Sequence, residues 1–116
     1  KLLTDIPDLV EFFFKEEIEY DDNAVKKVFK HNLNAKRVLS ELKLEFIQLK
    51  DFTANSLENL CRDYSSKNAL KTGEVFHPIR VAVSGRMEGP GLFEMLALMG
   101  KERVINRIDF ALQKFF

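Results

Sequence analysis

Apolar side chains recur about every 3.6 residues along much of this 116-residue chain, and this spacing constrains the fold more than any other feature. A long stripe consists of Leu33, Val38, Leu39, Leu42, Phe46, Ile47 and Leu49. A second stripe near the end of the chain consists of Val104, Ile105, Ile108, Ala111, Leu112 and Phe115. Each stripe predicts an amphipathic helix whose apolar face packs inward.

Shorter segments show the same spacing and carry helix start signals. An apolar run over 9–14 follows a proline and an aspartate, which predicts a short helix. After an acidic turn, Asp22 is expected to cap a helix that ends near Asn32. Residues 53–64 predict a further helix that stops in the polar stretch 65–68.

The stretch over 75–85 fits two alternatives. Its β-branched residues favour a strand, whereas Pro78 at a first helical position and Gly85 just past the end would suit a helix. The pattern alone leaves this choice open. Beyond it, residues 92–99 predict a helix closed by a glycine, and a last helix is expected over 101–116.

The polar stretch 65–68, with Thr72 and Gly73 soon after it, predicts a boundary between two subdomains. We place an N-terminal helical subdomain over 1–68 and a C-terminal helical subdomain over 69–116.

Composition excludes several classes of protein. Cys61 is the single cysteine and His31 and His77 are the only histidines, too few for an internal disulfide or a structural zinc site. A reducing, cytoplasmic location is therefore expected. No apolar run approaches the roughly 18 residues of a membrane span. Because the chain starts at Lys1 without a signal-peptide pattern, we expect a piece of a longer protein.

The formal net charge is zero, but the charges are unevenly distributed. Residues 1–22 are acidic, residues 23–50 are basic, and the part from Lys67 onward leans basic. This distribution favours nucleic-acid binding only mildly, because a solvated surface of mixed charge is its more common cause.

Several catalytic motifs are missing from the sequence. It has no glycine-rich phosphate loop and no H-E-x-x-H pair, so we expect neither an ATP site nor a metal centre in this chain. Ser84, His77 and Asp109 could supply a catalytic triad, but no nucleophile elbow surrounds the serine. We therefore expect no catalytic residue.

The Gly-Pro-Gly turn over 89–91, just ahead of Leu92, is the most informative motif. Two glycines around a proline make a rigid turn that presents backbone N–H groups at a helix N-terminus. Such groups can read the bases of single-stranded RNA while arginines hold the phosphates, and Arg80 and Arg86 precede the turn. The alternative is an ordinary loop between helices with solvated arginines.

The motifs around this turn, taken in order and spacing, resemble the C-terminal anticodon-binding region of bacterial glutamyl-tRNA synthetases. They are Lys71 and Gly73, then Phe76-His77-Pro78-Ile79-Arg80-Val81-Ala82-Val83-Ser84-Gly85-Arg86, then Gly89-Pro90-Gly91-Leu92-Phe93-Glu94, then Gly100-Lys101-Glu102-Arg103. The aromatic segment over 8–14 resembles the start of that region, so the likeness covers essentially the whole chain.

The resemblance implies an all-α, multihelical fold of two packed helical subdomains, the anticodon-binding domain of a class I aminoacyl-tRNA synthetase. It implies a helix after the step from His77 to Pro78, so that tertiary packing overrides β propensity there. The implied partners are the anticodon stem-loop of tRNA(Glu), with tRNA(Gln) left open, and the catalytic domain of the parent chain. Neither DNA nor a membrane is expected as a partner.

The full-length enzyme of this family joins glutamate to tRNA in translation, using ATP and Mg²⁺. Its ATP-binding signatures are missing from this sequence, so the resemblance implies no catalysis and no cofactor in this chain.

The resemblance also assigns a site. The predicted RNA-binding residues are Arg80, Ser84, Arg86, Gly89, Pro90, Gly91 and Leu92. Backbone groups of the turn and the Leu92 side chain would read bases, and Arg86 would hold a phosphate. Arg80 serves either a phosphate or a buried structural pair. The family commonly has a polar residue where Gly89 stands, so Gly89 could act only through its backbone.

Two expectations concern the rest of the surface. Lys101, Arg103 and Arg107 are interpreted as helix-surface charges. The alternative function is a helical structural or protein-interaction module, in which the phenylalanines over 12–14 and 115–116 dock a partner.

Overall fold

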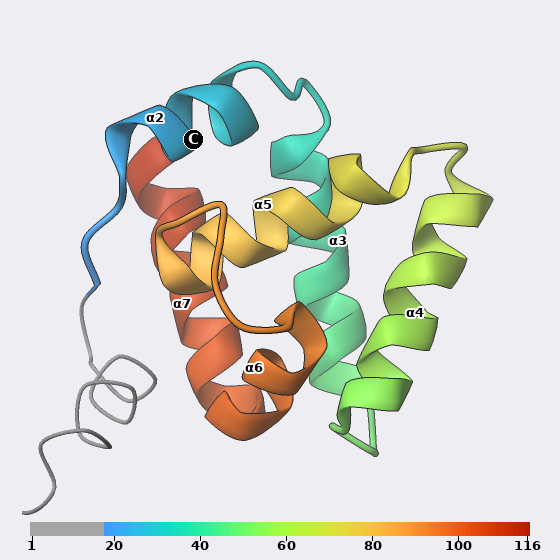
Figure 1. The fold of residues 1–116 in the computed structure, drawn as a ribbon. Coiled ribbons are helices and arrows are strands. Elements are labelled where there is room, and N and C mark those ends of the chain that lie inside the picture. Colours follow the sequence, from blue (N-terminus) through green and yellow to red (C-terminus); the bar gives the residue numbers. More distant parts are fainter. Residues whose placement is uncertain (1–17) are drawn as a thin grey trace, which may run out of the picture.

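The computed structural model describes residues 18–116, and this part of the chain consists of helices and the loops between them (Figure 1). The short α2 (Asp22–Ala24) continues into a π-helical segment, η1 (Val25–Lys30). Five longer helices follow: α3 (Ala35–Gln48), α4 (Ala54–Lys67), α5 (Thr72–Ser84), α6 (Leu92–Met99) and α7 (Lys101–Phe115). The expected all-α fold is confirmed, whereas the helix expected over 9–14 lies outside the described residues.

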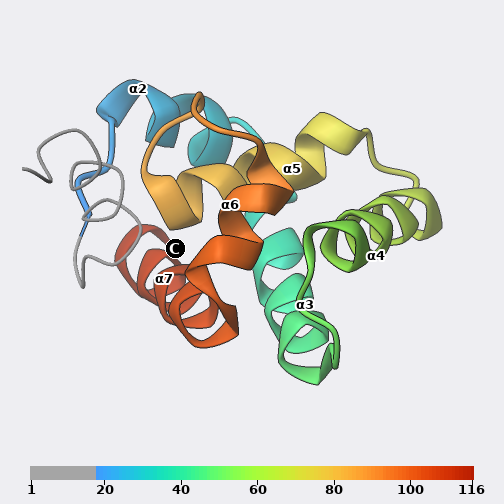
Figure 2. The same ribbon diagram turned by 60° about the horizontal axis from the view of Figure 1, so that its bottom comes forward.

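Helix α5 runs through the middle of the molecule and packs against α3, α4, α7 and η1, while α4 also packs against α6 (Figures 1 and 2). One cluster of buried apolar side chains joins these helices. Among its fully buried members are Phe46, Leu57, Ile79 and Ile108. Burying each such side chain contributes about 1.5–3 kcal/mol. This core includes residues from both predicted subdomains, and their division between residues 68 and 69 stays a prediction.

The start of α2 differs from the expectation by one residue. The carboxylate of Asp21, not that of Asp22, accepts a hydrogen bond from the Ala24 N–H over 3.0 Å and caps the helix. Past η1, the His31 N–H donates to the Lys26 carbonyl over 3.1 Å, which is the spacing of a π-helix.

The long helix begins at Ala35, two residues later than its apolar stripe indicates. The side-chain oxygen of Asn32 accepts from the Asn34 N–H over 3.0 Å, which turns the chain before the helix starts. Leu33 therefore lies in a loop with 92% of its surface exposed. Ile47, also expected to face inward, is about half exposed.

Helix α5 excludes the strand alternative for residues 75–85, and it begins at Thr72 rather than at Pro78. Pro78 has no N–H for the carbonyl of Glu74, four residues earlier. The side-chain amide of Asn32 donates to that carbonyl instead, over 2.9 Å. The helix therefore continues through its proline without leaving this partly buried acceptor unsatisfied.

The other helix boundaries confirm the sequence pattern. The hydroxyl of Thr53 caps α4 by accepting from the Ser56 N–H over 3.3 Å, and α4 ends at Lys67 within the polar stretch. Gly85, at a φ of +78°, ends α5. Within residues 18–116, no helix combines the length and the apolar character that crossing a lipid bilayer requires.

Candidate nucleic-acid interface

The loop between α5 and α6, residues 85–91, carries most of the predicted site and is fixed by other parts of the chain. The Arg80 guanidinium Nη1 donates to the Pro90 carbonyl over 2.8 Å. The Asp21 N–H donates to the Gly85 carbonyl over 2.8 Å. Partial burial lowers the pKa of Arg80, but a guanidinium stays charged at any physiological pH. The loop is therefore fastened at its start and near its end.

Gly85 is required by the close approach of the segment before α2. A Cβ at this position would lie 2.2 Å from the Glu19 carbonyl oxygen. The φ of +78° is also costly for any residue with a Cβ. Glycine therefore serves both as the end of α5 and as the contact for Glu19.

Ser84 joins the last turn of α5 to the loop. Its hydroxyl donates to the Arg80 carbonyl over 2.7 Å and accepts from the Arg86 N–H over 3.2 Å. The residue is 3% exposed. In this conformation Ser84 positions the loop, and its direct contact with RNA stays a prediction. Within the described residues no hydrogen bond links it to His77, and Asp109 instead pairs with Lys43 over 2.8 Å.

The turn itself is open to solvent. Arg86, Gly89, Pro90 and Gly91 are exposed, whereas Leu92 is only 6% exposed and packs into the core. Little of the Leu92 side chain is available to a base in this conformation, so its predicted contact has no support from the geometry.

The first turn of α6 follows directly, and its N–H groups are left without acceptors inside the helix. The carboxylate of Glu94 lies close to this end: a Cβ on Gly91 would be 2.3 Å from Glu94 Oε1. A negative charge is favourable at a helix N-terminus, so the Glu94 carboxylate is well placed in the first turn of α6.

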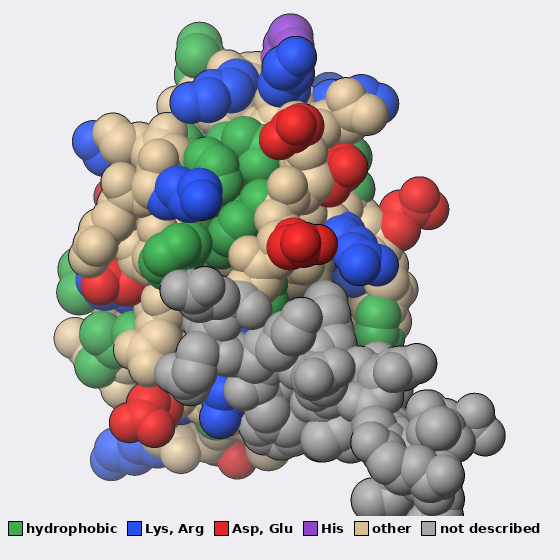
Figure 3. Space-filling view, turned by 90° about the vertical axis from the view of Figure 1, so that its left-hand side faces the viewer, with side chains coloured by type: hydrophobic (Ala, Val, Ile, Leu, Met, Phe, Trp, Pro, Cys, Tyr) green, Lys and Arg blue, Asp and Glu red, His purple; other side chains and the backbone are tan. Residues whose placement is uncertain are grey.

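A recess of about 750 Å³ lies beside the turn, between it and the segment that leads into α2. Lys27 and Arg86 line it together with the acidic Glu19, Asp21 and Glu88. Figure 3 shows this mixture, with Lys or Arg side chains denser at the end of the molecule that holds η1. The positive charge at the site therefore comes from individual basic side chains among acidic ones, and not from a broad basic face.

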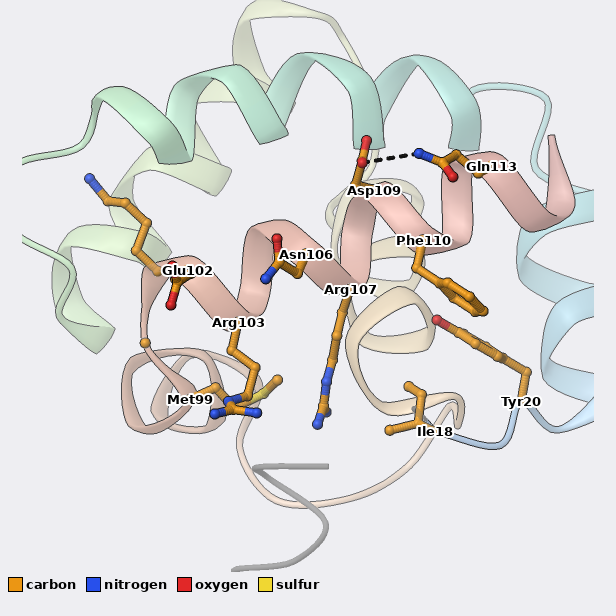
Figure 4. A pocket seen from close by; sticks show the side chains of 12 residues that line it. Ile18, Tyr20, Met99, Glu102, Arg103, Asn106, Arg107, Asp109, Phe110 and Gln113 are labelled. Carbon is orange, nitrogen blue, oxygen red and sulfur yellow. Dashed lines mark hydrogen bonds between the residues drawn. The ribbon is translucent and has the colours of Figure 1, made fainter. Parts of the chain in front are cut away.

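Arg107 was expected to be a charge on the helix surface, and this expectation was wrong. The residue is 4% exposed, and its Nη1 donates to the Val83 carbonyl in α5 over 2.8 Å. The signal was present in the sequence, because Arg107 lies at helical spacing between Val104 and Ala111 on the apolar stripe. Figure 4 shows its side chain projecting from α7 on the same side as that of Arg103.

Lys101 is likewise held by the fold. Its Nζ donates to the Ile47 carbonyl over 3.0 Å and also to the Leu49 carbonyl, at the C-terminal end of α3. A cation is favourable at that end of a helix. A cavity of about 600 Å³ extends from Lys101 along α7 to Tyr20 (Figure 4).

Tyr20 closes the far end of that cavity. Its hydroxyl donates to the Ala82 carbonyl over 2.9 Å, and its ring stacks on Phe110 with 6.2 Å between centroids. Burial raises the pKa of Tyr20 to about 12. Within the part of the chain that the structure describes, no group of three His, Cys, Asp or Glu side chains is placed to hold a metal ion.

The chain is similar to a known protein family and to proteins of known function. Residues 1–112 match the family model described as an anticodon binding domain. The "Glutamate--tRNA ligase" of Elusimicrobium minutum is 41% identical over 111 residues, which are 96% of this chain and 22% of that protein. The "Glutamate--tRNA ligase 2" of Thermoanaerobacter pseudethanolicus is 38% identical over 115 residues, 97% of this chain and 23% of that protein.

A solved structure of a glutamate tRNA ligase contains a region with a similar fold. The crystal structure of a glutamate tRNA ligase from Elizabethkingia meningosepticum superposes with a TM-score of 0.86 at 27% identity, over 97% of this chain and 22% of that one. The chain thus spans between a fifth and a quarter of the length of these relatives.

Proposed function

Because this chain belongs to the anticodon-binding domain family, we propose that it binds the anticodon loop of a tRNA through the exposed turn between α5 and α6. The tRNA is that of glutamate, in keeping with the glutamate–tRNA ligases to which the chain is similar.

The fixed loop is the observation that supports this proposal most. Binding a flexible RNA loop is favoured when the protein side is ordered beforehand, because less conformational entropy is then lost on association. Arg80 and Ser84 order the turn from α5: Arg80 donates to the Pro90 carbonyl over 2.8 Å, and the Ser84 hydroxyl accepts from the Arg86 N–H over 3.2 Å. The exposed Gly89 and Gly91 leave backbone donors and acceptors accessible for base edges.

Within this proposal the seven predicted residues divide into two roles. Arg86 holds a phosphate, and backbone groups of Gly89, Pro90 and Gly91 contact bases. Arg80, Ser84 and Leu92 support the turn from beneath.

The proposal extends to the longer protein of which this chain would be a part. That protein joins glutamate to tRNA in the cytoplasm, and its catalytic domain binds ATP and Mg²⁺. This chain contributes tRNA binding, and the sequence signatures of the ATP site are missing from it.

The test is the salt dependence of binding to the anticodon stem-loop of tRNA(Glu). Arg86→Ala is expected to weaken binding and to reduce the slope of log affinity against log salt by about one unit, because one phosphate contact is lost. Arg62→Ala, at an exposed arginine on α4, is the matched control and should leave the slope unchanged. Equal slopes for the wild type and Arg86→Ala would show that Arg86 does not touch the RNA.

A further inference from the structure

We infer that Tyr20 and Arg107 are positioning residues for RNA binding, which hold the loop over 85–91 in place through the last turn of α5 and do not touch the RNA themselves. This inference rests on the proposed function. Tyr20 lies in the segment before α2 and Arg107 lies on α7, so neither belongs to the loop. Both bond α5 just before the loop begins.

The last turn of α5 has backbone carbonyls that find no N–H partner inside the helix. Two consecutive ones are bonded by side chains from distant parts of the chain. The Tyr20 hydroxyl donates to the Ala82 carbonyl over 2.9 Å, and Arg107 Nη1 donates to the Val83 carbonyl over 2.8 Å. Because Ala82 and Val83 are fully buried, water cannot readily replace either donor.

The hydroxyl of Tyr20 is held in a fixed direction by its ring. The ring packs against Phe110 and Phe115, with 6.2 and 4.8 Å between centroids. Since burial raises the pKa of Tyr20 to about 12, the hydroxyl keeps its proton and donates at any physiological pH. Figure 4 shows the Tyr20 ring beside Phe110, on the side of α7 from which Arg107 projects.

The neighbours of Tyr20 extend its contact with the end of α5. The Asp21 N–H donates to the Gly85 carbonyl over 2.8 Å. The Glu19 carbonyl oxygen would lie 2.2 Å from a Cβ on Gly85. Residues 19–21 therefore lie along the end of α5, with the Tyr20 side chain as their hydrogen bond to the helix itself.

Arg107 is costly where it stands, because its position on α7 is 4% exposed. An apolar side chain would pack on this face without the cost of burying a charge. What the guanidinium adds is a hydrogen bond to the Val83 carbonyl and a positive charge at the C-terminal end of α5, where a cation is favourable. Its chemistry is therefore directed at the end of α5 rather than at packing alone.

The bonded carbonyls are next to the residues that shape the loop. Ser84 follows Val83 directly, and its hydroxyl accepts from the Arg86 N–H over 3.2 Å. A shift of the last turn would move Ser84 and, through it, Arg86. Tyr20 and Arg107 thus order the start of the loop before RNA arrives, which lowers the conformational entropy lost on binding.

The two tyrosines of the chain supply a matched pair of variants. Tyr20→Phe removes one hydroxyl and keeps the ring against Phe110. We expect it to weaken binding of the tRNA(Glu) anticodon stem-loop about threefold. It should also lower the order of the amides over 86–91 in the free chain, as measured by nuclear magnetic relaxation. Tyr64→Phe removes a hydroxyl that donates to the Glu41 carboxylate, away from the loop, and should change neither quantity.

This comparison separates positioning from stability. Each variant loses one hydrogen-bonded hydroxyl, so a purely structural role would leave affinity unchanged at a temperature at which both chains are folded. Equal affinities for the wild type and Tyr20→Phe would overturn the inference alone. Weaker binding with unchanged order over 86–91 would overturn it too, because the hydroxyl would then contact the RNA. If the wild type does not bind the stem-loop, the proposed function fails and this inference fails with it.

Variants of Arg107 provide a second measurement. Arg107→Met removes the guanidinium with little change in length and should weaken binding about tenfold, since the lost hydrogen bond has a charged donor. Arg107→Lys keeps a cationic donor and should recover part of that loss. Circular dichroism checks that each variant is folded, and the tyrosine pair decides the inference if Arg107→Met is not. A folded Arg107→Met that binds like the wild type, or equal losses for both variants, would contradict the role of Arg107.

Discussion

Arg80 donates from Nη1 to the Pro90 carbonyl over 2.8 Å, and so connects the middle of α5 to the turn that precedes α6. A Cβ on Gly89 would lie 3.4 Å from the same nitrogen, which shows how closely the guanidinium lies against the turn. The shape of the proposed RNA-binding turn therefore depends on a side chain from a neighbouring helix, and the sequence left this arginine with two alternative roles.

Arg80→Met should weaken RNA binding strongly while it destabilises the fold only slightly. We expect the anticodon stem-loop to bind about tenfold more weakly, because the turn loses its support. The free energy of unfolding should fall by only about 1 kcal/mol, since the lost hydrogen bond is partly exposed to solvent. Fluorescence anisotropy and urea titrations measure the two effects. Arg62→Met on α4 serves as control, and equal affinities for the two variants would contradict the assigned role.

Gly85→Ala should destabilise the fold more than Gly100→Ala. Both glycines have positive φ, +78° and +89°, and backbone strain at such positions costs about 1–3 kcal/mol once a Cβ is present. At Gly85 the new Cβ would also lie 2.2 Å from the Glu19 carbonyl oxygen, whereas at Gly100 nothing lies within 4 Å. Thermal unfolding of both variants measures the difference. A smaller loss for Gly85→Ala than for Gly100→Ala would argue against the close approach of Glu19.

Asn32 and Pro78 should be energetically coupled through the Glu74 carbonyl. Asn32→Ala leaves that carbonyl without its 2.9 Å partner and should cost about 1–3 kcal/mol of stability. In a Pro78→Ala background residue 78 regains an N–H that can bond the same carbonyl, so the cost of Asn32→Ala should shrink. A double-mutant cycle measured by urea unfolding gives the coupling. Purely additive losses would mean that the proline does not create the need for Asn32.

The same carbonyl shows why some features could be predicted from the sequence and others could not. The positions of the helices and the end of α5 at Gly85 depend on residues that are close in the sequence. The local sequence pattern was therefore sufficient to predict them. The helix that continues through Pro78 depends on Asn32, which is 42 residues from Glu74 in the sequence. Local rules contain no information about such a partner.

In the candidate site, too, some features could be predicted from the sequence and others were predicted wrongly. The exposed Gly-Pro-Gly turn follows from its residues alone. Leu92 was expected to face RNA, but it shares the buried side of α6 with Leu96 and Met99 at helical spacing. Arg107 was expected at the surface because it is charged, yet its buried guanidinium bonds the Val83 carbonyl. Helix phase would have identified both as inward-facing residues.

Stability should decline between pH 10 and 12 through two tyrosines. Burial raises the pKa of Tyr20 and of Tyr64 to about 12, above the value of 10.0 for an ordinary tyrosine. The folded state therefore keeps these protons longer than the unfolded state, so the stabilisation is complete below pH 10 and is lost as the pH rises toward 12.

Lysines also titrate in that range, so the comparison needs a variant with phenylalanine at both positions. The Tyr20→Phe, Tyr64→Phe double variant should lose stability less steeply over the same pH range, as measured by urea midpoints. If the stability of the wild type and of the variant fell equally steeply with pH, the tyrosines would not be the cause of the decline.

The most direct test of RNA binding by the turn is an amide-shift titration of the labelled chain at low salt. The ligands are the tRNA(Glu) anticodon stem-loop and a hairpin of the same length with a scrambled loop. The proposal predicts shifts concentrated over residues 84–93 that are larger for the tRNA(Glu) loop. Equal shifts with both hairpins, or no shift over those residues, would contradict anticodon recognition by this turn.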